Sequence, residues 1–254
     1  MAIHCTLAIE ATAEYCVAVK LQVACFERLG APGWAALEEV ARRAKERDLL
    51  VIADAKRGDV PITAHAYAQA FLGEAQTIFG PVAGLGADAL TVNPLLGEDS
   101  LQPLVQAARP RGAGLFVLVR TSNPGAADLQ EASLADGHTL SQRIARLVNQ
   151  LGSAGGGSSG WTDVGAVVGA TAPERLEQLR ALMPQAVFLI PGVGAQGGRL
   201  EDLQPAFQPG PAGGLIAVSR GLVDAYRQHG GEPASAAAAQ AAALRERAWA
   251  LARG

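Results

Sequence analysis

The chain has 254 residues, 49% hydrophobic and 18% charged, so it contains enough apolar material for a sizeable core. Its net charge of −3, with scattered basic residues, gives no electrostatic case for nucleic-acid binding, and no uncharged apolar run reaches the roughly 18 residues that a membrane span needs. The N-terminus resembles no signal peptide, and Cys5, Cys16 and Cys25 lack metal-ligand spacing, which indicates a reducing cytoplasm and no zinc site.

Helices and strands are predicted to alternate through the first half of the chain. Apolar residues that recur at intervals of three and four predict a helix over residues 3–15. The elements expected next are a strand at 16–22, a helix at 33–47, a strand at 49–54, a helix at 61–71, a strand at 88–93 and a helix at 99–108. Pro103 is expected to kink or restart the last of these helices.

The second half continues the same alternation. Gly114–Arg120 is the clearest strand, and the loop 121–125 follows it. The elements expected next are a helix at 138–151, strands at 164–170, 186–190 and 214–219, and helices at 173–183 and 235–251. The Gly/Ser-rich stretch 153–160 is interpreted as a flexible connection, because a phosphate cradle needs a preceding strand and usually a following lysine.

The predicted strands are continuously apolar, which indicates a parallel sheet buried on both faces. We therefore expect α/β architecture in a single domain over residues 1–254. A (β/α)8 TIM-type barrel is favoured over an open doubly wound sheet. Seven of the eight barrel strands are visible, and the chain opens on a helix.

A charged segment follows the strand at 49–54. Asp54 and Lys56 are two residues apart and should share a strand face, and Asp59 follows a turn at Gly58. Lys20 lies near the end of the preceding strand, so four charges of alternating sign could meet at one end of the sheet. An ammonium flanked by carboxylates stays charged and can protonate a carbanion. The alternative is a surface turn with solvated charges.

Other polar residues also follow predicted strands. Gly194 and Gln196 follow the strand at 186–190, and Ser219 and Arg220 follow the last strand. Barrel enzymes commonly bind a phosphate at these positions, and an arginine can bind it through two hydrogen bonds. The alternatives are a tight turn at each glycine and a solvated Arg220. Asn93, before Pro94, could simply end a strand.

Several motifs in their order along the chain resemble the orotidine 5′-phosphate decarboxylase family, in its bacterial branch. The signature is Asp54-Ala-Lys-Arg-Gly-Asp59. Further agreement lies in the motifs Val19-Lys-Leu-Gln-Val-Ala-Cys-Phe-Glu27, Thr121-Ser-Asn-Pro124, Val168-Gly-Ala-Thr171, Pro191-Gly-Val-Gly-Ala-Gln-Gly197 and Ser219-Arg-Gly221. The resemblance covers about residues 16–225.

The resemblance implies decarboxylation of orotidine 5′-phosphate to uridine 5′-phosphate in pyrimidine biosynthesis, without metal or cofactor. Its implied catalytic residues are Lys56, which protonates C6, Asp54, which faces the substrate carboxylate, and Lys20, which completes the charge network. Asp59 and Thr63 would act across the interface of a homodimer with shared active sites. The implied substrate-binding residues are Thr63, Asn93, Thr121, Ser122 at the pyrimidine, Gly194, Ser219, and Gln196 with Arg220 at the phosphate.

The family also implies a first strand that ends in a Gly-x-Asp-Pro-like turn, and nothing before Cys16 supplies one. We therefore expect a shortened N-terminus with unpaired edges on the strands near 17–22 and 215–219. Poor solubility or low activity is expected, and a restored first strand should correct it.

Two alternative functions remain open. A magnesium-dependent sugar-phosphate decarboxylase or aldolase of the ketogulonate-phosphate kind shares the Asp-x-Lys-x-x-Asp motif. Those relatives typically carry an acidic residue where Lys20 stands, and a lysine there repels a metal ion. The other alternative is an inactive, shortened relative.

Overall fold

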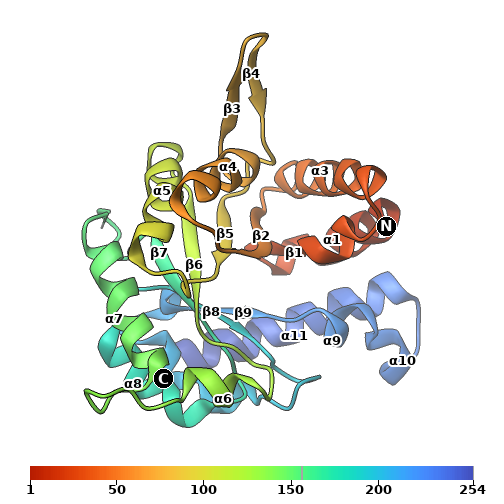
Figure 1. Cartoon of the computed structure of the whole chain (residues 1–254). Coiled ribbons are helices and arrows are strands. Elements are labelled where there is room, and N and C mark those ends of the chain that lie inside the picture. Colours follow the sequence, from red (N-terminus) through yellow and green to blue (C-terminus); the bar gives the residue numbers. More distant parts are fainter. Residues whose placement is uncertain (156, 254) are drawn as a thin grey trace.

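The computed structural model describes residues 1–155 and 157–253, and Figure 1 shows their arrangement. Seven strands of this part of the chain form one parallel sheet in the order β1-β2-β5-β6-β7-β8-β9. Their bounds are β1 (Ala18–Gln22), β2 (Leu50–Arg57), β5 (Ala89–Val92), β6 (Gly114–Arg120), β7 (Val164–Val168), β8 (Phe188–Pro191) and β9 (Gly214–Ala217). The expected parallel α/β barrel with seven strands is confirmed.

The expected helices are present, with ends shifted by a few residues. The helices are α1 (Ala2–Thr12), α2 (Val23–Glu27), α3 (Ala31–Lys45), α4 (Pro61–Phe71), α5 (Glu98–Ala108), α6 (Ala126–Gln130), α7 (Leu140–Ser153), α8 (Leu176–Leu182), α9 (Arg220–Val223), α10 (Ala225–His229) and α11 (Pro233–Arg253). The short α2, α6, α9 and α10 were not predicted. Helix α5 runs through Pro103 without restarting, and Gly156 of the expected flexible connection lies outside the described residues. None of the described helices is both long and apolar enough to cross a membrane.

The apolar core has two layers, and strand β2 shows how its residues divide between them. Val51 and Ala53 pack in the larger layer, between the strands and the surrounding helices. Ile52 belongs to a smaller cluster with side chains of β5, β6, β7 and β8, namely Ala89, Phe116, Val167 and Leu189. Because side chains alternate along a strand, Asp54 lies on the same face as Ile52. Asp54 of β2 therefore points into the barrel, whereas Arg57 lies over the Tyr67 and Phe71 rings of α4.

The sheet is nearly closed. In the described part of the chain, β1 and β9 are its two edges, as expected for seven strands. A cavity of about 1160 Å³ lies beside these edges, and its largely apolar lining includes side chains of α1, β1, β9 and α11. All seven strands run in the same direction, so their carboxyl ends meet at one end of the barrel.

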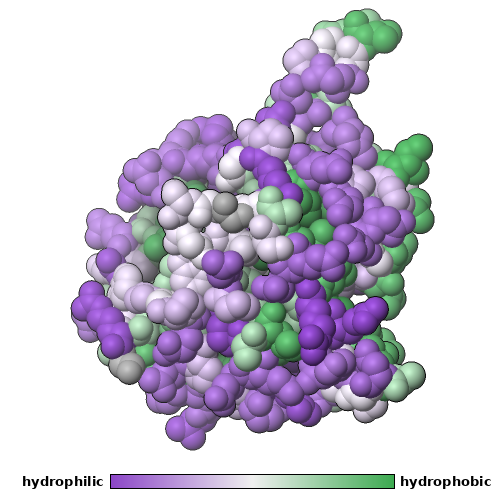
Figure 2. Space-filling view, turned by 90° about the vertical axis from the view of Figure 1, so that its left-hand side faces the viewer, coloured by the Kyte–Doolittle hydropathy of each residue, from purple (hydrophilic) through white to green (hydrophobic). Residues whose placement is uncertain are grey.

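A β-hairpin between α4 and β5 was not predicted. Its strands are β3 (Glu74–Thr77) and β4 (Gly80–Ala83), and it projects from the body of the molecule in Figure 1. Its tip is formed by Ile78 and Phe79, which are 93% and 94% exposed, and Figure 2 shows this hydrophobic end. The turn lacks the Asn-Gly or Asp-Gly pair that usually signals a hairpin, which explains why the pattern was missed.

Arg180 is a buried, charged side chain of α8 that links this helix through hydrogen bonds to the loops around η4 (Leu200–Phe207). Its side chain donates to four carbonyl oxygens, those of Met183, Ala186, Ala206 and Gly213, at 2.7–2.9 Å. Its guanidinium also lies 3.7 Å from the centre of the Phe188 ring. Burial disfavours the charged form and lowers the pKa of Arg180 to about 10.

We expect Arg180→Met to destabilise the protein by roughly 3 kcal/mol or more, because it leaves several buried carbonyls without a donor. The measurement is urea unfolding, with Arg143→Met as the matched control, since the Arg143 side chain is 69% exposed. The control should change the free energy of unfolding by less than about 0.5 kcal/mol. Equal effects of the two substitutions would contradict this role of Arg180.

Candidate active site

Asp54 joins two lysines at the carboxyl end of β2. Its Oδ2 lies 2.6 Å from Lys20 Nζ, and its Oδ1 lies 2.5 Å from Lys56 Nζ. Lys20 reaches the site because it pairs in register with Ile52, on the face of the sheet that points inward. In the orientation that satisfies its neighbours, the Gln22 side-chain amide also donates to Asp54 Oδ2, at 2.6 Å. The predicted meeting of Lys20, Asp54 and Lys56 is therefore observed.

A bulge in β2 places these groups. Ala53 pairs with Leu90 and Arg57 with Val92, so the three residues 54–56 lie opposite the single residue Thr91 of β5. Bulges are common beside active sites because they re-aim side chains. Gly58 then allows the end of β2 to approach Asn93, since a Cβ at this position would lie 2.7 Å from the Asn93 carbonyl oxygen.

Asp54 is held ionised. Asp54 is only 7% exposed, and burial by itself would raise the pKa of its carboxyl group. The two neighbouring ammonium groups of Lys20 and Lys56 outweigh burial, and the pKa of Asp54 lies below its ordinary value. At neutral pH the group consists of one carboxylate between two cations, a net positive charge that attracts an anionic substrate.

The lowered pKa of Asp54 predicts a pH-dependent contribution to stability. A carboxyl whose folded pKa is depressed stabilises the protein above its unfolded pKa of about 3.9, and this contribution is lost as the pH falls through the folded pKa. We expect the stability gap between the unsubstituted protein and Asp54→Asn to be constant from pH 7 to about 5 and to shrink below about pH 4. Urea unfolding at each pH measures it, and a gap that persisted unchanged to pH 2 would contradict the assignment.

Asp59 and Thr63 do not join the Lys20–Asp54–Lys56 group within one subunit. Asp59 Oδ1 accepts the backbone N–H of Val60 at 2.8 Å and has no ion pair within residues 1–155 and 157–253. Thr63 lies half-buried in the first turn of α4. Asn93 directly follows β5, and its Oδ1 accepts the N–H of Leu95. This side chain therefore stabilises the turn after the strand, which fits the alternative that Asn93 ends a strand.

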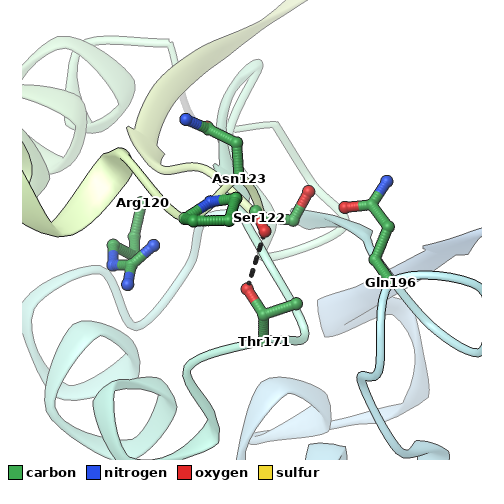
Figure 3. A pocket seen from close by; sticks show the side chains of 6 residues that line it. Arg120, Ser122, Asn123, Thr171 and Gln196 are labelled. Carbon is green, nitrogen blue, oxygen red and sulfur yellow. Dashed lines mark hydrogen bonds between the residues drawn. The ribbon is translucent and has the colours of Figure 1, made fainter.

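A second group of predicted residues lies two strands from β2, around a pocket of about 560 Å³. Figure 3 shows Ser122 and Gln196 on its walls, together with Arg120, Asn123 and Thr171. Thr121 lies beside it, where its hydroxyl contacts Asn123 Oδ1 at 2.7 Å. The structure therefore places Ser122 and Gln196 on one pocket, whereas the family resemblance assigned Ser122 to the pyrimidine and Gln196 to the phosphate.

The position of Ser122 is fixed from three sides. Thr171 donates from Oγ1 to the Ser122 carbonyl oxygen at 3.1 Å (Figure 3). A Cβ at Gly169 would lie 2.7 Å from Ser122 Cα, and one at Gly192 would lie 2.9 Å from Ser122 Cβ. The glycines of the Val168-Gly-Ala-Thr171 and Pro191-Gly motifs thus let the ends of β7 and β8 close around this loop.

Arg120 is a pocket residue that the sequence analysis did not single out. It is 8% exposed, and its Nε donates to Glu131 Oε1 at 2.8 Å, while Arg175 donates to the other carboxylate oxygen at 3.1 Å. These two arginines hold the pKa of Glu131 below its ordinary value. The only sequence signal for Arg120 was a charge at the end of an apolar strand.

The expected phosphate residues follow β8 and β9, which are neighbouring strands. Gly194 has a φ of +73°, and its N–H donates to the Gly198 carbonyl, which matches the tight-turn alternative. Gln196 is exposed on the same turn. Ser219 and Arg220 are exposed at the start of α9, and Arg220 has no ion pair among the described residues.

A nearly closed parallel barrel with buried charges at the carboxyl ends of its strands has the architecture of the (β/α)-barrel enzymes. The family model of the orotidine 5′-phosphate decarboxylase / HUMPS family matches residues 4–237. The chain belongs to this family.

Relatives named orotidine 5′-phosphate decarboxylase agree with this membership. The protein from Rhodopirellula baltica is 46% identical over 224 residues, which cover 88% of this chain and 73% of that one. The protein from Deinococcus radiodurans is 49% identical over 215 residues, covering 84% and 74%.

Solved structures are similar as well. The structure of Leishmania donovani OMP decarboxylase has a TM-score of 0.80 at 36% identity, covering 100% of this chain and 88% of that one. The structure of Leishmania donovani UMP synthase has the same TM-score at 38% identity. The match covers 98% of this chain and 50% of the UMP synthase chain.

Proposed function

We propose that this protein decarboxylates orotidine 5′-phosphate to uridine 5′-phosphate, a carbon–carbon lyase step of pyrimidine biosynthesis. The observation that carries the proposal is the Lys20–Asp54–Lys56 group, with both Asp54 oxygens bound to ammonium groups at 2.5–2.6 Å. Relatives at 46% and 49% identity that are named for this activity support it. The three cysteines are free thiols, which fits a reaction in the cytoplasm.

Each residue of the charged group has a proposed role in the reaction. The bond between C6 and the carboxylate carbon breaks, carbon dioxide leaves, and the electron pair stays on C6. Lys56 gives an Nζ proton to C6 and then takes one from water, and its side chain is 43% exposed and so open to a substrate. Asp54 faces the substrate carboxylate, and Lys20 keeps the carboxylate of Asp54 paired and contacts the ribose.

The parts of the substrate that are remote from C6 are proposed to bind to the second group of residues. We place the pyrimidine near Ser122 and Thr121, and the phosphate near Gln196, Gly194, Ser219 and Arg220. Asn93 is a further proposed substrate-binding residue. Arg220 supports the phosphate position because it is exposed and has no ion pair among the described residues. Binding at these sites supplies energy that stabilises the transition state at C6.

We propose that the protein acts as a homodimer in which Asp59 and Thr63 complete the site of the partner subunit. Within one subunit the Asp59 carboxylate accepts only the adjacent Val60 N–H among the described residues, so it is available to a second copy. Thr63, on the following helix, is half-buried near the same loop.

No metal ion or organic cofactor takes part in the proposed reaction. Both oxygens of Asp54 are bound by lysine ammonium groups, which compete with a cation for the carboxylate. This arrangement disfavours the magnesium-dependent sugar-phosphate decarboxylase or aldolase.

The test is loss of orotidine 5′-phosphate absorbance in the presence of excess EDTA. It uses the whole chain, residues 1–254. We expect turnover that survives chelation. The absence of turnover would refute the proposed function, and turnover that EDTA abolished and magnesium restored would favour the metal-dependent alternative.

A further inference from the structure

Thr91 lies at the centre of the charged group, although nothing in its sequence context distinguishes it. It is the single β5 residue opposite the three bulged residues of β2, and it is 1% exposed. The hydrogen-bond ladder between β2 and β5 is therefore interrupted at Thr91.

The Thr91 hydroxyl bridges the backbone of Lys56 and the side chain of Asp54. Its Oγ1 accepts the backbone N–H of Lys56 at 2.9 Å and donates to Asp54 Oδ1 at 2.9 Å. A backbone N–H can only donate and an ionised carboxylate can only accept, so the direction of both hydrogen bonds is fixed. One hydroxyl thus links the backbone of Lys56 to the carboxylate of Asp54.

Lys56 needs such support because its backbone is strained. Its φ is +52°, in the left-handed region that residues other than glycine rarely adopt. Backbone strain of this kind persists only where the surroundings hold it, and it concentrates at active sites. The hydrogen bond to Thr91 gives the Lys56 N–H an acceptor where the interrupted ladder offers none from β5.

We propose that Thr91 is a positioning residue for the reaction, a role that rests on the proposed function. Its hydroxyl holds the backbone of Lys56 in the conformation that aims the ammonium at C6, and it fixes the Asp54 carboxylate between its lysines. Thr91 itself does not contact the reacting atoms. A purely structural threonine, in contrast, would act through its buried methyl group, which valine reproduces.

The experiment compares Thr91→Val, Thr91→Ser and a control, Thr162→Val. Valine keeps the shape of threonine and removes the hydroxyl, and serine keeps the hydroxyl. Thr162 is a suitable control because its hydroxyl donates to the Val164 carbonyl at 3.0 Å, before β7 and at the opposite end of the barrel. Turnover is measured as kcat, and binding as the dissociation constant of uridine 5′-phosphate.

We expect Thr91→Val to lower kcat by about 10- to 100-fold, because small misplacements of reacting groups cost this much. The affinity for uridine 5′-phosphate should stay within about twofold, since the pyrimidine and phosphate residues are untouched. Thr91→Ser should recover most of the lost kcat, and Thr162→Val should leave it unchanged. Unchanged kcat in Thr91→Val, or an equal loss of affinity and kcat, would overturn the proposal.

A second readout separates this proposal from the proposed function. Asp54 faces Lys20, Lys56, Gln22 and Thr91, and loss of the Thr91 donor should raise its pKa. The titration of the Asp54 side-chain carbon by NMR should therefore move to higher pH in Thr91→Val and return in Thr91→Ser. If the protein does not turn over orotidine 5′-phosphate, the proposed function fails, while an unmoved titration would refute the role of Thr91.

Discussion

Lys56→Ala should lower decarboxylation by roughly 10³-fold or more and leave the fold intact. The substitution removes the ammonium that lies 2.5 Å from Asp54 Oδ1 and is the proposed proton donor to C6. Asp54 keeps its ion pair with Lys20, so the buried carboxylate is still balanced. For that reason the loss should lie in kcat, with little change in thermal unfolding.

Lys45→Ala is the matched control for Lys56→Ala. Lys45 lies at the end of α3, and its Nζ contacts the Gly86 carbonyl, outside the site. It should retain full turnover. If Lys56→Ala kept more than about a tenth of the turnover of the unsubstituted protein, Lys56 would not be the proton donor.

Mixed dimers should recover activity from two inactive variants. Asp59→Ala is expected to be nearly inactive, because Asp59 is proposed to complete the partner's site. A dimer with one Lys56→Ala and one Asp59→Ala subunit contains one site with neither substitution and one site with both. Equal mixing with full exchange should therefore restore about a quarter of the original turnover, as two-fold symmetry requires.

The exchange itself must be shown independently of activity. Subunits carrying different tags allow the mixed dimer to be isolated and its activity measured directly. The isolated mixed dimer should have about half the original turnover. A verified mixed dimer without activity would rule out a site shared between subunits, and full activity of Asp59→Ala alone would remove Asp59 from the reaction.

Much of the charged group could be predicted, because it depends on short-range geometry. Asp54 and Lys56 are two residues apart on a strand, and Lys20 lies on the strand that pairs with β2. The order of the parallel strands then brings the residues at their carboxyl ends to one end of the barrel. Ser122 and Gln196 follow β6 and β8 at this same end, which lets them line one pocket although they are far apart in the sequence.

What the sequence did not reveal depends on contacts between strands. Thr91 stands in the apolar run Ala89-Leu-Thr-Val92, where threonine is an ordinary strand residue. Its role follows only from the bulge in β2, which changes the register by two residues, and periodicity does not predict a bulge. The side-chain hydrogen bonds of Thr171 to Ser122 and of Arg175 to Glu131 likewise join segments that are distant in sequence.

The most direct test of the account follows both products of a substrate labelled in its carboxylate. Orotidine 5′-phosphate with a carbon-14 carboxyl group is incubated with the protein in deuterium oxide, and the released gas and the nucleotide are quantified. The proposed reaction yields labelled carbon dioxide and uridine 5′-phosphate in equal amounts, with one deuterium at C6, and Lys56→Ala should form neither product. Consumption of the substrate without labelled carbon dioxide, or undiminished release by Lys56→Ala, would contradict it.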